Sequence, residues 1–132
     1  PFSQYAAVIP NFIIKMLKEE RPAIFGDGEQ SRDFTYVANV VIANILATVV
    51  PGITGEIFNI ACGERTTINS LAETINEILM KKISPFHAEP RPGDIRHSFA
   101  DISKAKKMLK YEPLVPFEKG LRETVRWFKK GK

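Results

Sequence analysis

Apolar positions recur with helical spacing in two well separated parts of the chain. The first run extends from Val8 to Leu17 and stops before Pro22, which predicts an amphipathic helix. The second run follows Thr66 or Thr67, and either hydroxyl can cap a helix start. Its apolar stripe consists of Ile68, Leu71, Ala72, Ile75, Ile78 and Leu79.

A third segment, residues 38–50, is apolar almost throughout, so we expect a helix that is buried on most of its sides. Pro51 and Gly52 end it. Further along, Asp101 can cap a helix over residues 102–109, and Pro116 can start a last helix.

Short extended segments separate these helices. We predict strands at residues 23–25, 33–37, 56–61 and 84–88, because each is rich in strand-forming residues and most are bounded by turn residues. Strands that alternate with helices indicate an α/β architecture. The strands are too few and too short for a convincing sheet, so we expect the chain to be part of a larger protein. The apolar helix at 38–50 and the strand at 56–61 would then pack against residues outside this chain.

Size, composition and charge narrow the picture. The 132 residues, 44% of them hydrophobic, are enough for one domain with a core. Cys62 is the only cysteine, which excludes an internal disulfide framework and fits a reducing compartment. We see no secretory signal and no apolar run of bilayer length, so we expect a cytoplasmic protein without a membrane partner.

A net charge of +4 raises the question of nucleic acid. The lysines at 104–110 alternate with apolar positions, the pattern of a solvated helix face, so we predict no nucleic-acid role. The glycine-rich motifs of dinucleotide sites, P-loops and serine hydrolases do not occur in these residues.

Three polar loops follow strand candidates, where α/β proteins place ligand contacts: residues 26–32, 62–65 and 91–97. Arg32 and Arg91 lie in two of them, and a pair of fixed guanidinium groups suits a diphosphate. Equally, each arginine could pair with a neighbouring acid, Asp33 or Asp94, as a structural salt bridge. The spacing leaves both alternatives open.

Three further residues were considered for ligand or metal binding. Phe25 could stack on a base, although a Phe at the end of an apolar strand is more often core. His87 and His97 flank the proline loop, but their spacing matches no metal motif, so we predict no metal site. No general acid-base pair emerges from the sequence.

Four segments together resemble the extended short-chain dehydrogenase/reductase family, and within it the UDP-sugar 4-epimerases. The most specific is Phe25-Gly26-Asp27-Gly28-Glu29-Gln30-Ser31-Arg32-Asp33-Phe34-Thr35-Tyr36-Val37. The others are Tyr5-Ala6-Ala7-Val8-Ile9-Pro10, Phe58-Asn59-Ile60-Ala61 and Arg91-Pro92-Gly93-Asp94-Ile95-Arg96. Their order and spacing match over essentially the whole chain.

The resemblance implies binding roles for named residues. Arg32 and Arg91 would hold the diphosphate of a UDP-sugar and act as a pivot while a 4-keto intermediate turns over. Asp94 would lie near the ribose. The uracil would be held by Val8, Ile9, Pro10 and Phe25. Some relatives have a tyrosine in place of Phe25, so stacking survives here without a phenolic hydrogen bond.

The same resemblance implies that NAD and the catalytic residues belong to another part of the fold. The family's glycine-rich NAD loop and its Tyr-x-x-x-Lys pair precede the matched region, and this sequence contains neither. No tyrosine here has Lys four positions on. We therefore expect residues 1–132 to be the substrate-binding C-terminal part of an extended Rossmann-type enzyme, with no catalytic residue and inactive alone.

Several alternatives stay open within this picture. A dTDP-glucose 4,6-dehydratase or a UDP-glucuronate decarboxylase shares the same framework, and the residues that decide between these reactions are absent. A different class is a non-catalytic module that binds a partner protein or itself through bare apolar faces. The complete enzyme is expected to be a homodimer, as is common in the family, and the sequence does not reveal which sugar is bound.

Overall fold

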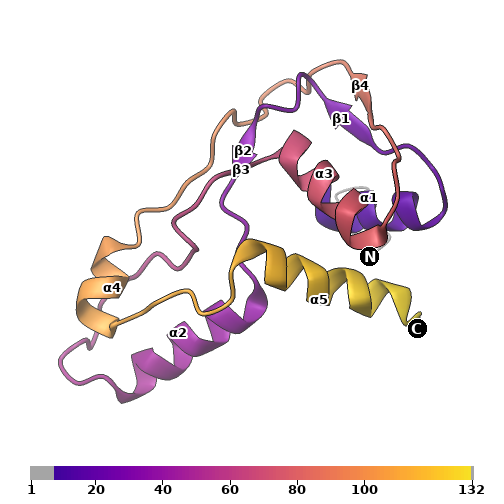
Figure 1. Cartoon of the computed structure of the whole chain (residues 1–132). Coiled ribbons are helices and arrows are strands. Elements are labelled where there is room, and N and C mark those ends of the chain that lie inside the picture. Colours follow the sequence, from indigo (N-terminus) through magenta and orange to yellow (C-terminus); the bar gives the residue numbers. More distant parts are fainter. Residues whose placement is uncertain (1–7, 132) are drawn as a thin grey trace.

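The computed structural model describes residues 8–131, which fold into five helices and four short strands. The helices are α1 (Val8–Leu17), α2 (Val37–Val49), α3 (Ile68–Leu79), α4 (Ser103–Leu109) and α5 (Phe117–Lys129). The strands are β1 (Ala23–Phe25), β2 (Ser31–Arg32), β3 (Thr66–Thr67) and β4 (Phe86–Ala88). Figure 1 shows α1, α3 and α5 gathered near β1 and β4, with α2 and α4 at the other end.

The larger hydrophobic cluster joins α1, α3 and α5. Ile13 and Met16 from α1 and Leu71 and Ile75 from α3 are completely buried. These positions recur with the helical period of the sequence, so the predicted amphipathic helices are confirmed. Thr67 caps α3 as expected, because its side-chain oxygen accepts a hydrogen bond from the Ser70 backbone at 3.1 Å.

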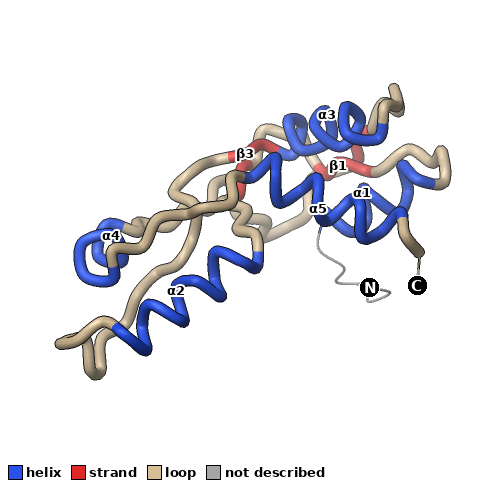
Figure 2. Tube along the Cα trace, turned by 60° about the horizontal axis from the view of Figure 1, so that its bottom comes forward, coloured by secondary structure: helices blue, strands red, loops and turns tan. Residues whose placement is uncertain are grey.

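The smaller cluster lies at the other end, where α4 packs beside α2 (Figure 2). Tyr111 is buried there and donates a hydrogen bond to the Ala61 carbonyl at 2.9 Å. Buried Asn39 fastens α2 to the segment before α5, since its amide donates to Val115 O and accepts from Val115 N. Hydrogen bonds from buried side chains therefore accompany the apolar packing at this end.

The strands form two small pairs. β1 and β4 are parallel, with Ala23 opposite Phe86, whereas β2 and β3 are antiparallel. A bridge between Ser31 and His97 brings the segment after β4 beside β2. The prediction of a poor sheet is confirmed, and the pairs serve mainly to position the loops around them.

Two strand predictions were wrong. The extended segment expected at residues 33–37 lies outside the ladder, and the strand there is Ser31–Arg32. The Asp33 carboxylate accepts backbone hydrogen bonds from Cys62 and Gly63, both at 3.0 Å, which draws the chain away from strand pairing. Residues 56–61 form no strand, because no described strand pairs with them, and Ile57 is 83% exposed.

The helix α2 also departs from expectation. We predicted burial on most sides, yet Asn39 and Ala43 are its buried residues. Val41, Ile45 and Val49 are between 49% and 68% exposed. Within the described residues α4 packs against one side of this helix, so the cover that we expected it to need is not supplied there. None of the helices between residues 8 and 131 is long and apolar enough to cross a membrane.

Candidate functional site

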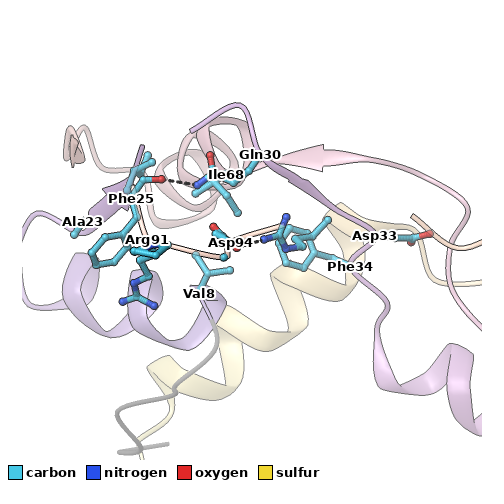
Figure 3. Close-up of a pocket in the computed structure, with 13 residues that line it drawn as sticks. Val8, Ala23, Phe25, Gln30, Asp33, Phe34, Ile68, Arg91 and Asp94 are labelled. Atoms are coloured by element: carbon cyan, nitrogen blue, oxygen red, sulfur yellow. Dashed lines mark hydrogen bonds and ion pairs between the residues drawn. The ribbon is translucent and has the colours of Figure 1, made fainter. Parts of the chain in front are cut away.

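A cavity of about 670 Å³ lies where β1, β2, the start of α1 and the loop after β4 meet. It collects five of the seven residues predicted to bind a ligand. They are Val8, Phe25, Arg32, Arg91 and Asp94 (Figure 3). Segments more than sixty positions apart thus meet at one site, which the β1–β4 pairing and the Ser31–His97 bridge bring together.

Arg32 is held at the cavity by two hydrogen bonds. Its Nη1 donates to the Ser31 carbonyl at 2.9 Å, and its Nη2 donates to Asp94 Oδ1 at 2.6 Å. The alternative pairing with Asp33 does not occur, because that carboxylate binds backbone amides of Cys62 and Gly63. The structural salt bridge weighed for Arg32 therefore exists, but its partner is Asp94.

Arg91 is positioned by an aromatic ring. The centre of its guanidinium lies 3.7 Å from the centroid of the Phe25 ring, a cation–π contact. Arg91 forms no ion pair with Asp94, although the Asp94 amide donates to the Arg91 carbonyl at 3.2 Å in the turn that joins them. Gly93 in this turn has a φ of 78°, which favours glycine. One face of Phe25 is consequently occupied by Arg91.

Sequence reasoning missed the ion pair that anchors the loop after β4. The Nη1 and Nη2 atoms of Arg96 donate to the two carboxylate oxygens of Asp27, at 2.7 and 2.8 Å. This contact and a hydrogen bond from Glu29 N lower the pKa of Asp27 to about 2. No signal in the sequence could pair these residues, since they are 69 positions apart.

Gln30 is a second residue that sequence reasoning missed. It lines the cavity, is 8% exposed, and its amide donates to the Phe25 carbonyl at 2.7 Å. A buried amide needs such a partner. The contact fixes the end of β1 relative to the turn that follows, so Gln30 supports the position of Phe25. A polar residue between a turn and a strand was the only signal for it.

The segment Val8–Pro10 is divided between two cavities. Val8 lines the cavity with Phe25, whereas Ile9 and Pro10 line a separate one of about 320 Å³ beside Phe34 and Phe117. The three residues occupy the first turn of α1, where successive side chains point in different directions. The structure therefore does not bring Ile9 and Pro10 together with the other predicted site residues.

The remaining titratable candidates have structural partners. His87 Nδ1 lies 2.7 Å from the Gly26 carbonyl, and His97 Nδ1 lies 2.9 Å from Ser31 Oγ. Within the described part of the chain, no three His, Cys, Asp or Glu residues are grouped as metal ligands would be. Burial, reinforced by the Asp33 charge, raises the pKa of the Cys62 thiol, which disfavours the thiolate form that reacts.

The cavity is lined by charged groups of both signs. Two guanidinium groups and two carboxylates line it, and Asp33 among these is already occupied by backbone amides. Tyr36 lines the smaller cavity, Tyr111 is buried against Ala61, and Tyr5 lies outside the described residues. The arrangement can hold a phosphorylated ligand, and it supplies no paired acid and base.

Comparison with curated proteins finds enzymes that act on UDP-sugars. The chain is 39% identical over 120 residues to a UDP-glucuronate 4-epimerase of Thermodesulfobacterium geofontis, covering 89% of this chain and 36% of that protein. It is 35% identical over 132 residues to a UDP-N-acetyl-α-D-glucosaminuronate decarboxylase of Bacillus cytotoxicus, covering 95% and 40%. The chain thus spans about two-fifths of the length of these relatives.

Solved structures agree with this result. A UDP-glucose 4-epimerase of Thermotoga maritima, solved with UDP-glucose, superposes with a TM-score of 0.91 at 43% identity, covering 98% of this chain and 41% of that one. A UDP-N-acetylglucosamine 4-epimerase of Methanobrevibacter ruminantium, solved with UDP-N-acetylmuramic acid, gives 0.91 at 45% identity, covering 99% and 42%. A Bacillus cereus UDP-glucuronic acid 4-epimerase, solved with UDP-glucuronic acid and NAD, gives 0.88 at 30% identity, covering 98% and 42%.

A family model provides the most direct assignment. The model described as GDP-mannose 4,6 dehydratase matches residues 3–124, which is nearly the whole chain. The fold class is therefore the α/β class of these enzymes, represented here by about two-fifths of their length. The chain belongs to the GDP-mannose 4,6 dehydratase family, a branch of the extended short-chain dehydrogenase/reductases.

Proposed function

We propose that this chain is the substrate-binding, C-terminal part of an NAD-dependent UDP-sugar 4-epimerase, with residues 1–132 acting as one substrate-binding region. The observation that carries the proposal is the cavity in which Arg32 and Arg91 meet beside Phe25. Two guanidinium groups match the charge of a diphosphate, and the ring beside them matches a base. Relatives solved with UDP-glucose and UDP-glucuronic acid support this choice of ligand.

The proposed roles follow the geometry of the cavity. Arg32 and Arg91 bind the diphosphate, Asp94 lies near the ribose, and Val8 and Phe25 hold the uracil. Ile9 and Pro10 remain in the proposal only as the residues that place Val8, because they line another cavity. The sugar then extends beyond these residues, toward groups that the described chain does not contain.

NAD completes the proposed enzyme. The described residues contain no glycine-rich dinucleotide loop, so they do not fit NAD, which another part of the protein would hold. When bound, NAD supplies hydride removal and return at the sugar. Arg32 and Arg91 of this chain would hold the diphosphate of the substrate in place while the sugar presents either face.

Epimerisation and decarboxylation share this binding framework. One of the relatives is a UDP-sugar decarboxylase, so decarboxylation is the alternative reaction. No described residue decides between epimerisation and decarboxylation. A chimera tests whether this region supports epimerisation: residues 8–131 replace the matching region of the Thermotoga maritima enzyme, whose remaining residues are kept. The proposal predicts interconversion of UDP-glucose and UDP-galactose. A folded, NAD-binding chimera that cannot epimerise UDP-sugars would contradict it.

A second candidate function rests on the exposed face of α2. Val41, Ile45 and Val49 are exposed at spacings of four residues on α2, and Ile57 is exposed in the segment that follows. This favours association with another part of the protein, with a second copy or with a partner protein. Light scattering and an apolar-surface dye test it, and a dye-silent monomer would count against an apolar docking face.

A further inference from the structure

The loop that carries Arg91 depends on its ends for its position. Among the described residues, no backbone hydrogen bond joins residues 89–95 to another segment, and the bond from Asp94 N to Arg91 O lies inside the loop. The guanidinium of Arg91 lies over the Phe25 ring, 3.7 Å from its centroid (Figure 3). Whether Arg91 stays over that ring is therefore decided by what anchors the loop on either side.

Arg96 anchors the far end of this loop. Its Nη1 and Nη2 donate to the two carboxylate oxygens of Asp27, at 2.7 and 2.8 Å, and its carbonyl accepts from Ser31 N at 2.9 Å. Asp27 comes two positions after Phe25, and Arg96 comes five positions after Arg91. The Asp27–Arg96 ion pair thus links the strand end that carries the ring to the loop that carries the guanidinium.

The turn that presents Asp27 is itself fixed. Asp27 Oδ1 also accepts from Glu29 N at 2.9 Å, which holds the carboxylate in one orientation. Asn69, in the first turn of α3, donates from Nδ2 to Asp27 O at 3.0 Å and from its backbone to Gly28 O at 3.1 Å. Gly28 has a φ of 80° and no room for a side chain beside Asn69. The turn is therefore packed directly on α3, and Arg96 is held by a rigid partner.

An ion pair of this kind acts on position more than on stability. Both side chains are 55% exposed, and exposed pairs contribute little to the stability of a fold. A contact of two nitrogens with two oxygens, however, fixes direction as well as distance. Neither Asp27 nor Arg96 lines the cavity. Any effect of the pair on a ligand must therefore pass through residues that do line it.

We infer that Asp27 and Arg96 are positioning residues, which hold the loop after β4 so that Arg91 stays over the Phe25 ring at the cavity. They link α3, through Asn69, to a guanidinium that binds the ligand. For the identity of that ligand the inference rests on the proposed function. The link itself stands on the contacts of Asp27, Arg96 and Asn69.

Two substitutions of opposite charge separate positioning from electrostatics. Removing the negative charge in Asp27→Asn would strengthen anion binding if charge alone mattered, whereas Arg96→Gln would weaken it. Positioning predicts that both variants of the 132-residue chain bind UDP about three- to fivefold more weakly, a factor in the upper part of the range for exposed ion pairs. Calorimetry measures the affinities. Tighter or unchanged UDP binding by Asp27→Asn overturns the inference.

A double-mutant cycle tests the route through Arg91. In an Arg91→Ala background, Asp27→Asn should change UDP affinity by less than about twofold, because the side chain that it positions is gone. A loss as large as in the parent chain would show a general structural effect and overturn the inference. The matched control is Arg126→Gln, which removes an exposed arginine of α5 paired with Glu123 and should leave UDP affinity within about twofold.

A readout without ligand keeps this inference distinct from the proposed function. Because its guanidinium lies over the Phe25 ring, the Cδ protons of Arg91 should resonate upfield of those of an unstructured arginine. Asp27→Asn and Arg96→Gln should move these resonances downfield, and Arg126→Gln should not. Unchanged Arg91 resonances overturn the positioning role. A chain that binds no UDP, yet shows the downfield shift in both variants, refutes the proposed ligand and supports the positioning of Arg91.

Discussion

Arg32 and Arg91 reach the same cavity by different physical means. Hydrogen bonds to Ser31 O and Asp94 fix the first, and the ring of Phe25 supports the second. The sequence could predict both residue types, because guanidinium groups in polar loops after strands suggest phosphate binding. It could not predict the Arg32–Asp94 pair, because those residues are 62 positions apart and only the fold brings them together.

Replacing Arg32 by alanine should weaken UDP binding by about 1.5–3 kcal/mol, the range for hydrogen bonds to charged groups. Arg32→Lys should recover only part of this, because an ammonium cannot form the two parallel contacts of a guanidinium. Arg122→Ala is the matched control, since Arg122 is an exposed arginine of α5 that pairs with Glu118 away from the cavity. A loss below about 1 kcal/mol for Arg32→Ala, measured by calorimetry, would argue against a phosphate clamp.

At the scale of elements, helices were easier to predict than strands. Residues 8–17 and 68–79 formed helices because their apolar period of 3.6 buries one face within the chain itself. Residues 56–61 have strand-forming composition but no pairing partner, and a strand exists only when a neighbour completes its hydrogen bonds. The composition of residues 56–61 therefore indicated a strand that would form only beside a pairing strand.

The turn after β1 should lose stability in acid. The Asp27 pKa falls from its ordinary value of 3.8 to about 2, first because of Arg96 and then because of the Glu29 amide. A carboxyl whose folded pKa is depressed stabilises the fold above its unfolded pKa and loses this contribution as pH falls through the folded one. We expect the loss between about pH 4 and pH 2, measured as unfolding midpoint against pH. In Asp27→Asn this part of the pH dependence should disappear; an unchanged profile would contradict the assignment.

Gly120 lies where α5 approaches the segment before α2. An added Cβ would sit 2.7 Å from Tyr36 Cβ, which is closer than side chains pack. Glycine to alanine inside a helix normally stabilises it by about 1 kcal/mol, but here overpacking should make Gly120→Ala less stable by about 1–3 kcal/mol. Urea unfolding measures the sign, with exposed Lys119→Ala as the control in the same helix. A stabilised Gly120→Ala protein would show that the two elements are less tightly packed.

The two ends of the molecule differ in how completely they bury their apolar side chains. α1, α3 and α5 close one cluster, whereas α2 leaves Val41, Ile45 and Val49 exposed. The chain covers about two-fifths of the length of the two UDP-sugar 4-epimerases that superpose on it. The sequence indicated the incomplete cover through the apolar run at 38–50, but it could not say which positions of the helix would stay uncovered.

Charging the exposed face should suppress association. Ile45 is 57% exposed, so Ile45→Glu should leave the fold intact. The added charge should reduce self-association, measured by light scattering, and binding of an apolar-surface dye, measured by fluorescence. Thr48→Glu provides the control, because it adds the same charge to an exposed polar position of α2. Equal effects of the two substitutions would show that net charge, and not the apolar face, governs association.

The proposed function requires a nucleotide-sugar binding site on this chain. Calorimetric titration of the chain with UDP, UDP-glucose and UDP-N-acetylglucosamine, with NAD in a parallel run, tests it most directly. We predict binding of all three UDP ligands with similar affinity, because the diphosphate and uracil supply the contacts, and no binding of NAD. Binding of NAD without the UDP ligands, or UDP binding that is unchanged in Arg32→Ala, would contradict this account.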